Sequence, residues 1–143
     1  MDFFPKFWTW IDEQFANGVL VSSMAVHDEL AEGDDELAQW AKDRKDTGFF
    51  IPASEEMQLL FRKISDYVIN NYPLHHAELF LSKADPWVIA HGKVEKLTVV
   101  TNEVLVSSIS KKPKIPNICK VHSVNSIDTV DLLRLLKPPF MSR

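Results

Sequence analysis

The feature that most constrains the fold of this chain is an apolar helix followed closely by a β-branched strand. An acidic residue lies at the start of the helix, and another lies just past the end of the strand. The helix is predicted to begin at Asp85, where the following proline suits a first helical turn, and to end near Gly92. The strand is predicted at residues 97–100, and Glu103 stands just past its end. Ligands and metals collect at the carboxyl ends of strands in open α/β sheets. The pattern therefore places both acids near a ligand-binding edge.

Strands and helices alternate along the rest of the chain without repeats or low-complexity tracts, which is typical of a layered α/β fold. Further short strands are predicted at residues 19–21, 49–51 and 119–124. Further helices are predicted from about residue 4 to a stop at Gly18, after Ser22 or Ser23, after Asp34, from Ser54 to 71, from 75 to 82, and after Ser126 or Asp128.

Composition fits one soluble globular domain with a single core, since 45% of the 143 residues are hydrophobic and 25% are charged. The lone Cys119 cannot form an internal disulfide. No leader peptide and no apolar run of about 18 residues is evident, so a cytoplasmic protein without a membrane segment is predicted. The net charge of −4 means that any nucleic-acid contact would need a local basic patch or bound cations.

The last third of the chain contains its least regular pattern. Residues 104–110 fit either a strand or an extended loop, and residues 111–116 are predicted to be irregular because of their prolines. Cys119 is predicted to be an inert core thiol in a buried strand. In the final helix, Val130, Leu133 and Leu136 are predicted to point inward, and Pro138-Pro139 is predicted to end it.

Four segments taken together resemble a known family. They are the helix with Glu29 after a Val-rich strand, ADPWVIAHG at 84–92, VVTNE at 99–103, and VHSVNSIDTVDLLRLL at 121–136. Over nearly the whole chain, 1–143, the sequence is similar to PIN domains, and closest to a bacterial PIN-like group encoded beside helix-turn-helix antitoxin genes. The resemblance implies a single PIN-like domain, a three-layer α/β/α fold with a mainly parallel sheet.

The same resemblance implies a metal-dependent ribonuclease, often the toxin of a toxin–antitoxin pair. It assigns the catalytic and metal-binding roles to Glu29, Asp85 and Glu103, with Thr101 and Asn102 in support. Hard cations such as Mg²⁺ or Mn²⁺ prefer oxygen ligands, and they lower the pKa of bound water and stabilise charge on a reacting phosphate. The implied reaction is the hydrolysis of RNA phosphodiesters, restrained by a cognate antitoxin protein. A homodimer is a further possible assembly.

One departure from the family is as informative as the match. PIN domains begin with an apolar strand that ends in a metal-binding aspartate, and this strand is absent here, so Asp2 is not taken for the missing ligand. In the family's strand order, 3-2-1-4-5, that strand is central, and the strands at 19–21 and 97–100 would lose their shared partner. Three explanations fit: the start lies upstream, another chain supplies the strand, or the two orphaned strands pair directly. Unpaired buried backbone groups would cost about 1 to 3 kcal/mol each.

Each acidic residue also has a simpler interpretation. Asp85 can serve as the N-cap of its helix, Glu103 can be an exposed turn residue, and Glu29 can be a solvated helix residue beside Asp28. Asp28 is the rival metal ligand, because the phase of that helix is uncertain by one residue.

Other residues give weaker signals. A zinc site at His75-His76 is disfavoured, because adjacent helical residues point in different directions and no third ligand has suitable spacing. The remaining basic candidates, which can contact an RNA backbone or simply form a solvated loop, are Lys111, Lys112 and Lys114.

Three hypotheses follow. The first is a PIN-like endoribonuclease that uses Mg²⁺ or Mn²⁺. The second is a PIN-like remnant that binds a partner or RNA without hydrolysing it, because the first aspartate is missing. The third is an unrelated α/β domain with no site at these residues.

Overall fold

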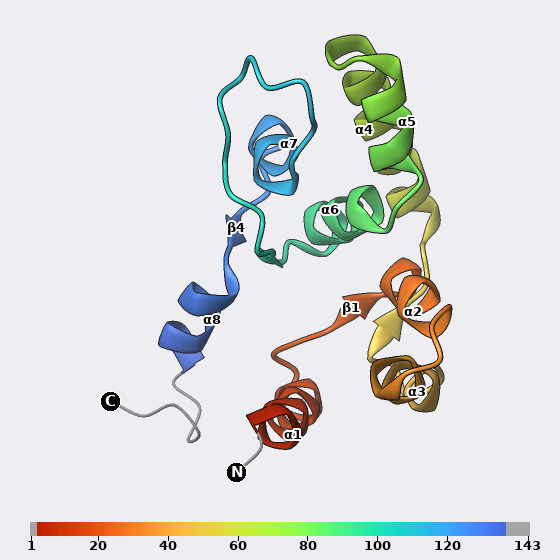
Figure 1. Ribbon diagram of the computed structural model, residues 1–143, viewed down its shortest axis with the longest axis vertical. Coiled ribbons are helices and arrows are strands. Elements are labelled where there is room, and N and C mark those ends of the chain that lie inside the picture. The colour runs from red at the N-terminus through yellow and green to blue at the C-terminus, as the bar shows by residue number, and fades with distance from the viewer. Residues whose placement is uncertain (1–2, 137–143) are drawn as a thin grey trace.

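A computed structural model describes residues 3–136 of the chain, with side chains from residue 6 onward. The fold is mixed α/β, and its short strands are connected by helices (Figure 1). In chain order the elements are α1 (Phe3–Ala16), β1 (Ser22–Ser23), α2 (Met24–Ala31), α3 (Glu36–Asp43), β2 (Phe50–Ile51), α4 (Glu55–Asn71), α5 (Leu74–Leu81), α6 (Asp85–Glu95), β3 (Val99–Val100), α7 (Ile115–Val121), β4 (Ser126–Ile127) and α8 (Thr129–Leu136).

Local capping signals determine where several helices begin. The Ser23 hydroxyl accepts a hydrogen bond from the Ala25 backbone N–H at the start of α2, and Ser54 caps α4 in the same way. The Ser54 cap was predicted, and Ser23 is one of the two residues predicted for the cap of α2. The predicted Asp34 cap is wrong by one residue, since Asp35 caps α3. Asp128 accepts from the Asp131 N–H at 2.7 Å, which confirms one of the two predicted caps of α8.

The four strands form two separate parallel pairs. Ser22 and Ser23 of β1 pair with Phe50 and Ile51 of β2, whereas β3 pairs with β4. Among the described residues β1 and β3 do not pair, so one of the three explanations, direct pairing of the two orphaned strands, is wrong. Helix α6 contacts both β1 and β3, and it lies in the middle of the molecule in Figure 1.

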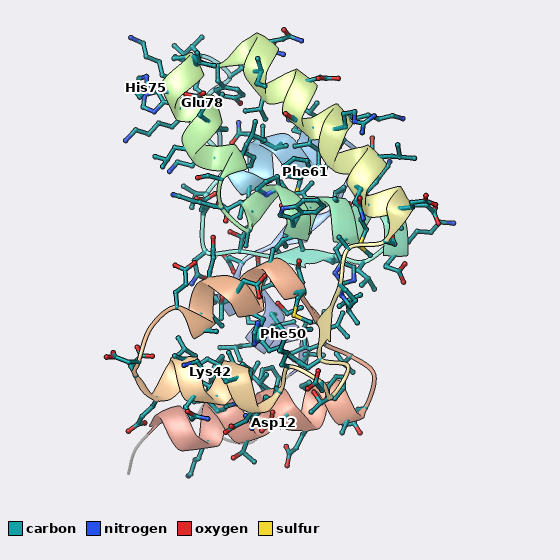
Figure 2. All side chains as sticks on the ribbon, turned by 90° about the vertical axis from the view of Figure 1, so that its right-hand side faces the viewer. Asp12, Lys42, Phe50, Phe61, His75 and Glu78 are labelled. Atoms are coloured by element: carbon teal, nitrogen blue, oxygen red, sulfur yellow. The ribbon has the colours of Figure 1, made fainter. Side chains whose placement is uncertain are left out.

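Two hydrophobic clusters fill the interior. The larger cluster packs α4, α5, α6, β3 and α7 together, and its fully buried members include Ile64, Val68, Ile89, Ile118 and Cys119. The smaller cluster surrounds Ala41, Phe49 and Phe50 and contains side chains from α1, α2 and α3. In Figure 2, the label of Phe50 lies in the lower half of the molecule, and that of Phe61, on α4, lies in the upper half.

Several predicted strands are wrong in position or type. The predicted strand at 19–21 is displaced to β1, and Val19 and Val21 are exposed because no described element covers them. The predicted strand at 119–124 is wrong, because the helix α7 already occupies this region up to Val121. Pro116 lies in the first turn of α7, where its missing N–H breaks no hydrogen bond, so the prediction of irregular backbone through residue 116 is wrong from Ile115 onward. Cys119 is nevertheless buried, as predicted, and burial raises the pKa of its thiol to about 12.

The ends of other elements differ more modestly. Helix α6 continues past the predicted end at Gly92 to Glu95, and Lys96 then ends it in the left-handed conformation. Residues 104–110 are loop rather than strand. In α8 the predicted inward orientation of Val130 is wrong, since that side chain is 52% exposed, while Leu133 and Leu136 are half-buried. The predicted stop at Pro138-Pro139 lies outside the described residues.

No helix within residues 3–136 is both long and apolar enough to cross a membrane.

Candidate functional site

Asp85 lies in the first turn of α6, at the centre of the candidate site. The N-cap of this helix is Ala84, which has helical backbone angles, so the interpretation of Asp85 as the N-cap is wrong. Burial raises the pKa of the Asp85 carboxyl, and the negative charges of Glu103 and then Glu29 raise it further. Lys83 partly opposes this shift. The structure therefore brings Glu103 and Glu29 close enough for their charges to act on the Asp85 carboxyl.

Glu29 connects α2 to the start of α6. Its Oε2 accepts a hydrogen bond of 2.7 Å from the backbone N–H of Ala84, although the two residues are 55 positions apart in the chain. An acceptor at this point suits the positive end of the helix dipole. Asp28 instead contacts the neighbouring ring of His27 at 3.0 Å and is 68% exposed. Of the two rival acids on α2, Glu29 is the one that reaches the start of α6.

Glu103 follows β3 and performs a similar task for another helix. Its Oε1 accepts a hydrogen bond of 2.7 Å from the backbone N–H of Ile115, the first residue of α7. The hydroxyl of Thr101 accepts from the Glu103 N–H at 3.1 Å and shapes the turn between them. Asn102, in the same turn, is exposed. Glu103 is therefore fixed in the fold and is not a free turn residue.

Each of the three acids lies at the N-terminus of a helix, either α6 or α7. Two lie at the start of α6, one on that helix and one reaching it from α2, and the third lies at the start of α7. Helix N-termini stabilise negative charge, which allows carboxylates to gather here despite their mutual repulsion. Glu29 accepts its backbone hydrogen bond through Oε2, and Glu103 accepts its own through Oε1. Within residues 3–136 no group of three or more His, Cys, Asp or Glu side chains has the arrangement of a preformed metal site.

A groove of about 620 Å³ lies beside Glu103, and neither Glu29 nor Asp85 lines it. Thr101 and Glu103 line one side of it, and Lys120, Asp128 and Asp131 contribute charged groups from α7 and the start of α8. Sequence reasoning missed Lys120 and Asp131 at this position. The proline-initiated start of α7 was the available signal, because a helix from residue 115 places Lys120 in its last turn.

The predicted basic residues lie on the loop that joins β3 to α7. Lys111 and Lys112 are exposed, and Lys114 is the half-buried N-cap residue of α7. The loop is closed at its base by the bond between Glu103 and Ile115. Two hydrogen bonds between the Asn117 amide and the backbone of Val106, at 3.0 and 2.8 Å, hold it against α7.

Comparisons with known proteins identify a family. No curated protein and no solved structure matches the chain significantly. The model of one protein family, described as Domain of unknown function (DUF4411), matches residues 1–140. That match spans nearly the whole chain, so the protein belongs to the DUF4411 family.

Proposed function

We propose that this protein is a PIN-like, metal-dependent endoribonuclease that hydrolyses RNA phosphodiesters. The observation that carries the proposal is the convergence of Glu29, Asp85 and Glu103, which are distant in the sequence. Burial and then the charges of Glu103 and Glu29 raise the pKa of Asp85, and Glu29 accepts the Ala84 N–H at the start of α6. A buried or half-buried carboxylate near two others is costly without a cation, which makes such clusters candidates for function. The donor set is entirely oxygen and suits Mg²⁺ or Mn²⁺.

The strand pairing supports the PIN-like part of the proposal. In the strand order 3-2-1-4-5, removal of the first strand leaves the pairs 3-2 and 4-5. The described strands form two such pairs, β2 with β1 and β4 with β3, and both pairs are parallel. Helix α6 contacts β1 and β3, which are the two strands that a central strand would join.

The three carboxylates have different roles in such a site. Asp85 provides a half-buried carboxyl in the first turn of α6, and the charge of Lys83 and a backbone hydrogen bond at Asp85 partly offset the burial that raises its pKa. Glu29 and Glu103 are held in place by their backbone hydrogen bonds, so their remaining oxygens have fixed positions. A bound Mg²⁺ or Mn²⁺ would supply a water of lowered pKa and stabilise charge on the phosphate. We further propose, from the family resemblance alone, that the enzyme acts as a toxin restrained by a cognate antitoxin.

A second candidate function rests on a specific observation. The hydrogen bonds of Glu29 and Glu103 already give each glutamate a structural role, and no preformed metal geometry occurs among residues 3–136. These facts favour the alternative that the chain is a PIN-like remnant that binds RNA or a protein partner without hydrolysis.

A cleavage assay separates the two candidates. Labelled RNA is incubated with the protein and Mn²⁺, with chelator, and with the Asp85→Asn variant. The proposal predicts cleavage that chelator abolishes and that Asp85→Asn lowers by at least about a hundredfold, as loss of a group acting on the transition state would do. An Asp28→Asn variant is the matched control and retains activity. Cleavage that survives chelator rejects the mechanism, and absence of cleavage in every condition favours the remnant.

A further inference from the structure

The groove beside Glu103 follows the extended backbone of β4 and its flanks. Consecutive residues, 123–128, line it, so one of its walls is a continuous stretch of the chain. Helix α7 and the loop after β3 contribute other walls, through Pro116 and Leu105 respectively. In Figure 1, β4 lies between α7 and α8. A hollow of about 620 Å³ is large enough for a short segment of polypeptide.

The edge of β4 that points away from β3 has backbone groups in position for further pairing. The Val99 N–H donates to the Asn125 carbonyl at 2.9 Å. The Thr101 N–H donates to the Ile127 carbonyl at the same distance, 2.9 Å. Successive carbonyls along a strand point in opposite directions, so the Ser126 carbonyl points away from β3. Among the described residues β4 pairs with β3 alone, and an open strand edge is a template for another extended chain.

The side chains of the groove combine apolar surface with an excess of negative charge. Val104 and Leu105, on the loop, are 69% and 56% exposed. Three carboxylates and one ammonium group line the groove, and they belong to Glu103, Asp128, Asp131 and Lys120. One oxygen of Glu103 and one of Asp128 accept backbone N–H groups, which leaves the second oxygen of each for another donor. Asp131 lies 3.9 Å from the exposed guanidinium of Arg134, too far for a hydrogen bond.

We propose that this groove binds an extended peptide segment of a partner protein, in which basic side chains lie among apolar ones. The peptide backbone pairs with the open edge of β4, and its apolar side chains contact Val104 and Leu105. A Lys or Arg side chain of the peptide meets the carboxylates of the groove. RNA is the less suitable occupant, because its phosphates would face those same carboxylates. This inference goes beyond the proposed function and holds whether or not the protein cleaves RNA.

The backbone pairing is tested by fluorescence anisotropy of a labelled peptide titrated with the full chain. The probe is Gly-Val-Arg-Val-Val-Arg-Val-Gly, which places one arginine on each face of an extended chain. Two further peptides carry methyl groups on alternate backbone nitrogens, one peptide for each register. The peptide whose methyl groups point toward β4 loses its donors and should bind at least about tenfold more weakly, as loss of two hydrogen bonds predicts. The other peptide should bind as the unmodified probe does.

The charge of the groove is tested with two variants of opposite expected effect. Asp131→Asn removes a carboxylate and should weaken peptide binding by about two- to fivefold, as expected for one exposed charge pair. Lys120→Gln removes the ammonium group of the lining and should strengthen binding by a similar factor. The matched controls Asp66→Asn and Lys63→Gln change exposed residues of α4 outside the groove and should leave binding unchanged.

The results separate a peptide groove from its alternatives. Opposite shifts for Asp131→Asn and Lys120→Gln, unchanged controls and weaker binding of one methylated peptide support the proposal. Equal binding of all three peptides, equal losses for Asp131→Asn and Asp66→Asn, or displacement of the probe by oligouridylate overturns it. Absence of probe binding at about 1 mM protein, with the fold confirmed by far-ultraviolet circular dichroism, also overturns it. RNA cleavage is measured separately, so the failure of either proposal leaves the other intact.

Discussion

The two strand pairs lie in interiors of different chemistry. The pair β3–β4 belongs to the half built on the larger cluster, where aliphatic side chains such as Ile64, Ile89 and Ile118 are fully buried. The pair β1–β2 belongs to the smaller cluster, where Phe49, Phe50 and the partly buried Trp40 meet edge to face. The difference shows that one half has a closed core of its own, and the other depends on fewer and more exposed contacts.

Polar contacts stabilise the smaller half where apolar burial is limited. The guanidinium of Arg44 donates two hydrogen bonds of 2.7 Å to the Asp12 carboxylate, which ties α3 to α1. This bond to Asp12 also raises the pKa of Arg44, so the guanidinium stays charged. The bond from Ala84 to Glu29 connects this half to α6 and hence to the larger cluster. The candidate site therefore lies at the boundary between the two halves.

The largest expected effect compares matched isoleucines in the two clusters. Ile118→Ala leaves a cavity among fully buried side chains and should lower the free energy of unfolding by about 2–5 kcal/mol. Ile11→Ala, at a partly buried position of α1, should cost only about 1–2 kcal/mol. Urea denaturation followed by circular dichroism measures both. Equal losses would contradict the distinction between a closed and an open core.

A glycine in α6 tests how tightly the larger half is packed. A Cβ at Gly92 would lie 2.8 Å from Cγ2 of the buried Val99 and 3.3 Å from the Leu97 carbonyl oxygen, so β3 would have to shift. Gly92→Ala should therefore destabilise the protein by about 1–3 kcal/mol, despite the better helix propensity of alanine. Gly33→Ala, in the smaller half, is the control, because its nearest neighbour would be 3.7 Å away. A thermal melt in which both variants match the parent protein would refute this packing.

The hydrogen bond from Ala84 to Glu29, which links the two halves, is expected to contribute less to the free energy of unfolding. Glu29→Ala removes the acceptor for the Ala84 N–H and should cost about 0.5–1.5 kcal/mol, since Glu29 is largely exposed. Glu29→Gln keeps an acceptor oxygen and should recover most of that stability. Chemical denaturation of the two variants checks this prediction, and a Gln variant as unstable as the Ala variant would show that the hydrogen bond is not the cause.

The smallest expected change in the free energy of unfolding is that of an Asp85 variant, and it is a gain of stability rather than a loss. Because the pKa of Asp85 is raised in the folded protein, the folded state holds this proton more tightly than the unfolded state does. Stability is therefore lost as pH rises from the ordinary value of 3.8 to the raised pKa, and the penalty stays constant above it. Asp85→Asn should be more stable than the parent protein at neutral pH, and the difference should vanish below pH 3.8. A variant less stable at neutral pH would contradict the electrostatic description.

How much the sequence could predict depended on whether the signal was local. Ser54 was correctly identified as a cap, and the cap of α2 was narrowed to Ser22 or Ser23, because a cap needs only its own helix. The strand at 19–21 was misplaced by a few residues because pairing with Phe50 and Ile51 decides which residues become extended. Residues 119–124 alternate like a strand, yet the helix that starts near Pro116 occupies residues up to Val121 and takes precedence over that short pattern.

In the candidate site, too, local features could be predicted from the sequence and long-range contacts could not. Glu29, Asp85 and Glu103 could be named from the segments around them, but their partners could not. The acceptor role of Glu29 toward Ala84 joins residues 55 positions apart, and no periodicity encodes such a contact.

The central claim is that the three carboxylates bind a divalent cation, and Mn²⁺ binding measured by isothermal titration calorimetry at neutral pH tests it most directly. The parent protein should bind Mn²⁺, and Asp85→Asn should weaken that binding by at least about tenfold, or about 1.4 kcal/mol. Asp28→Asn, the neighbouring rival on α2, should bind as the parent does. Binding that Asp85→Asn leaves intact, or that only Asp28→Asn removes, would contradict the site described.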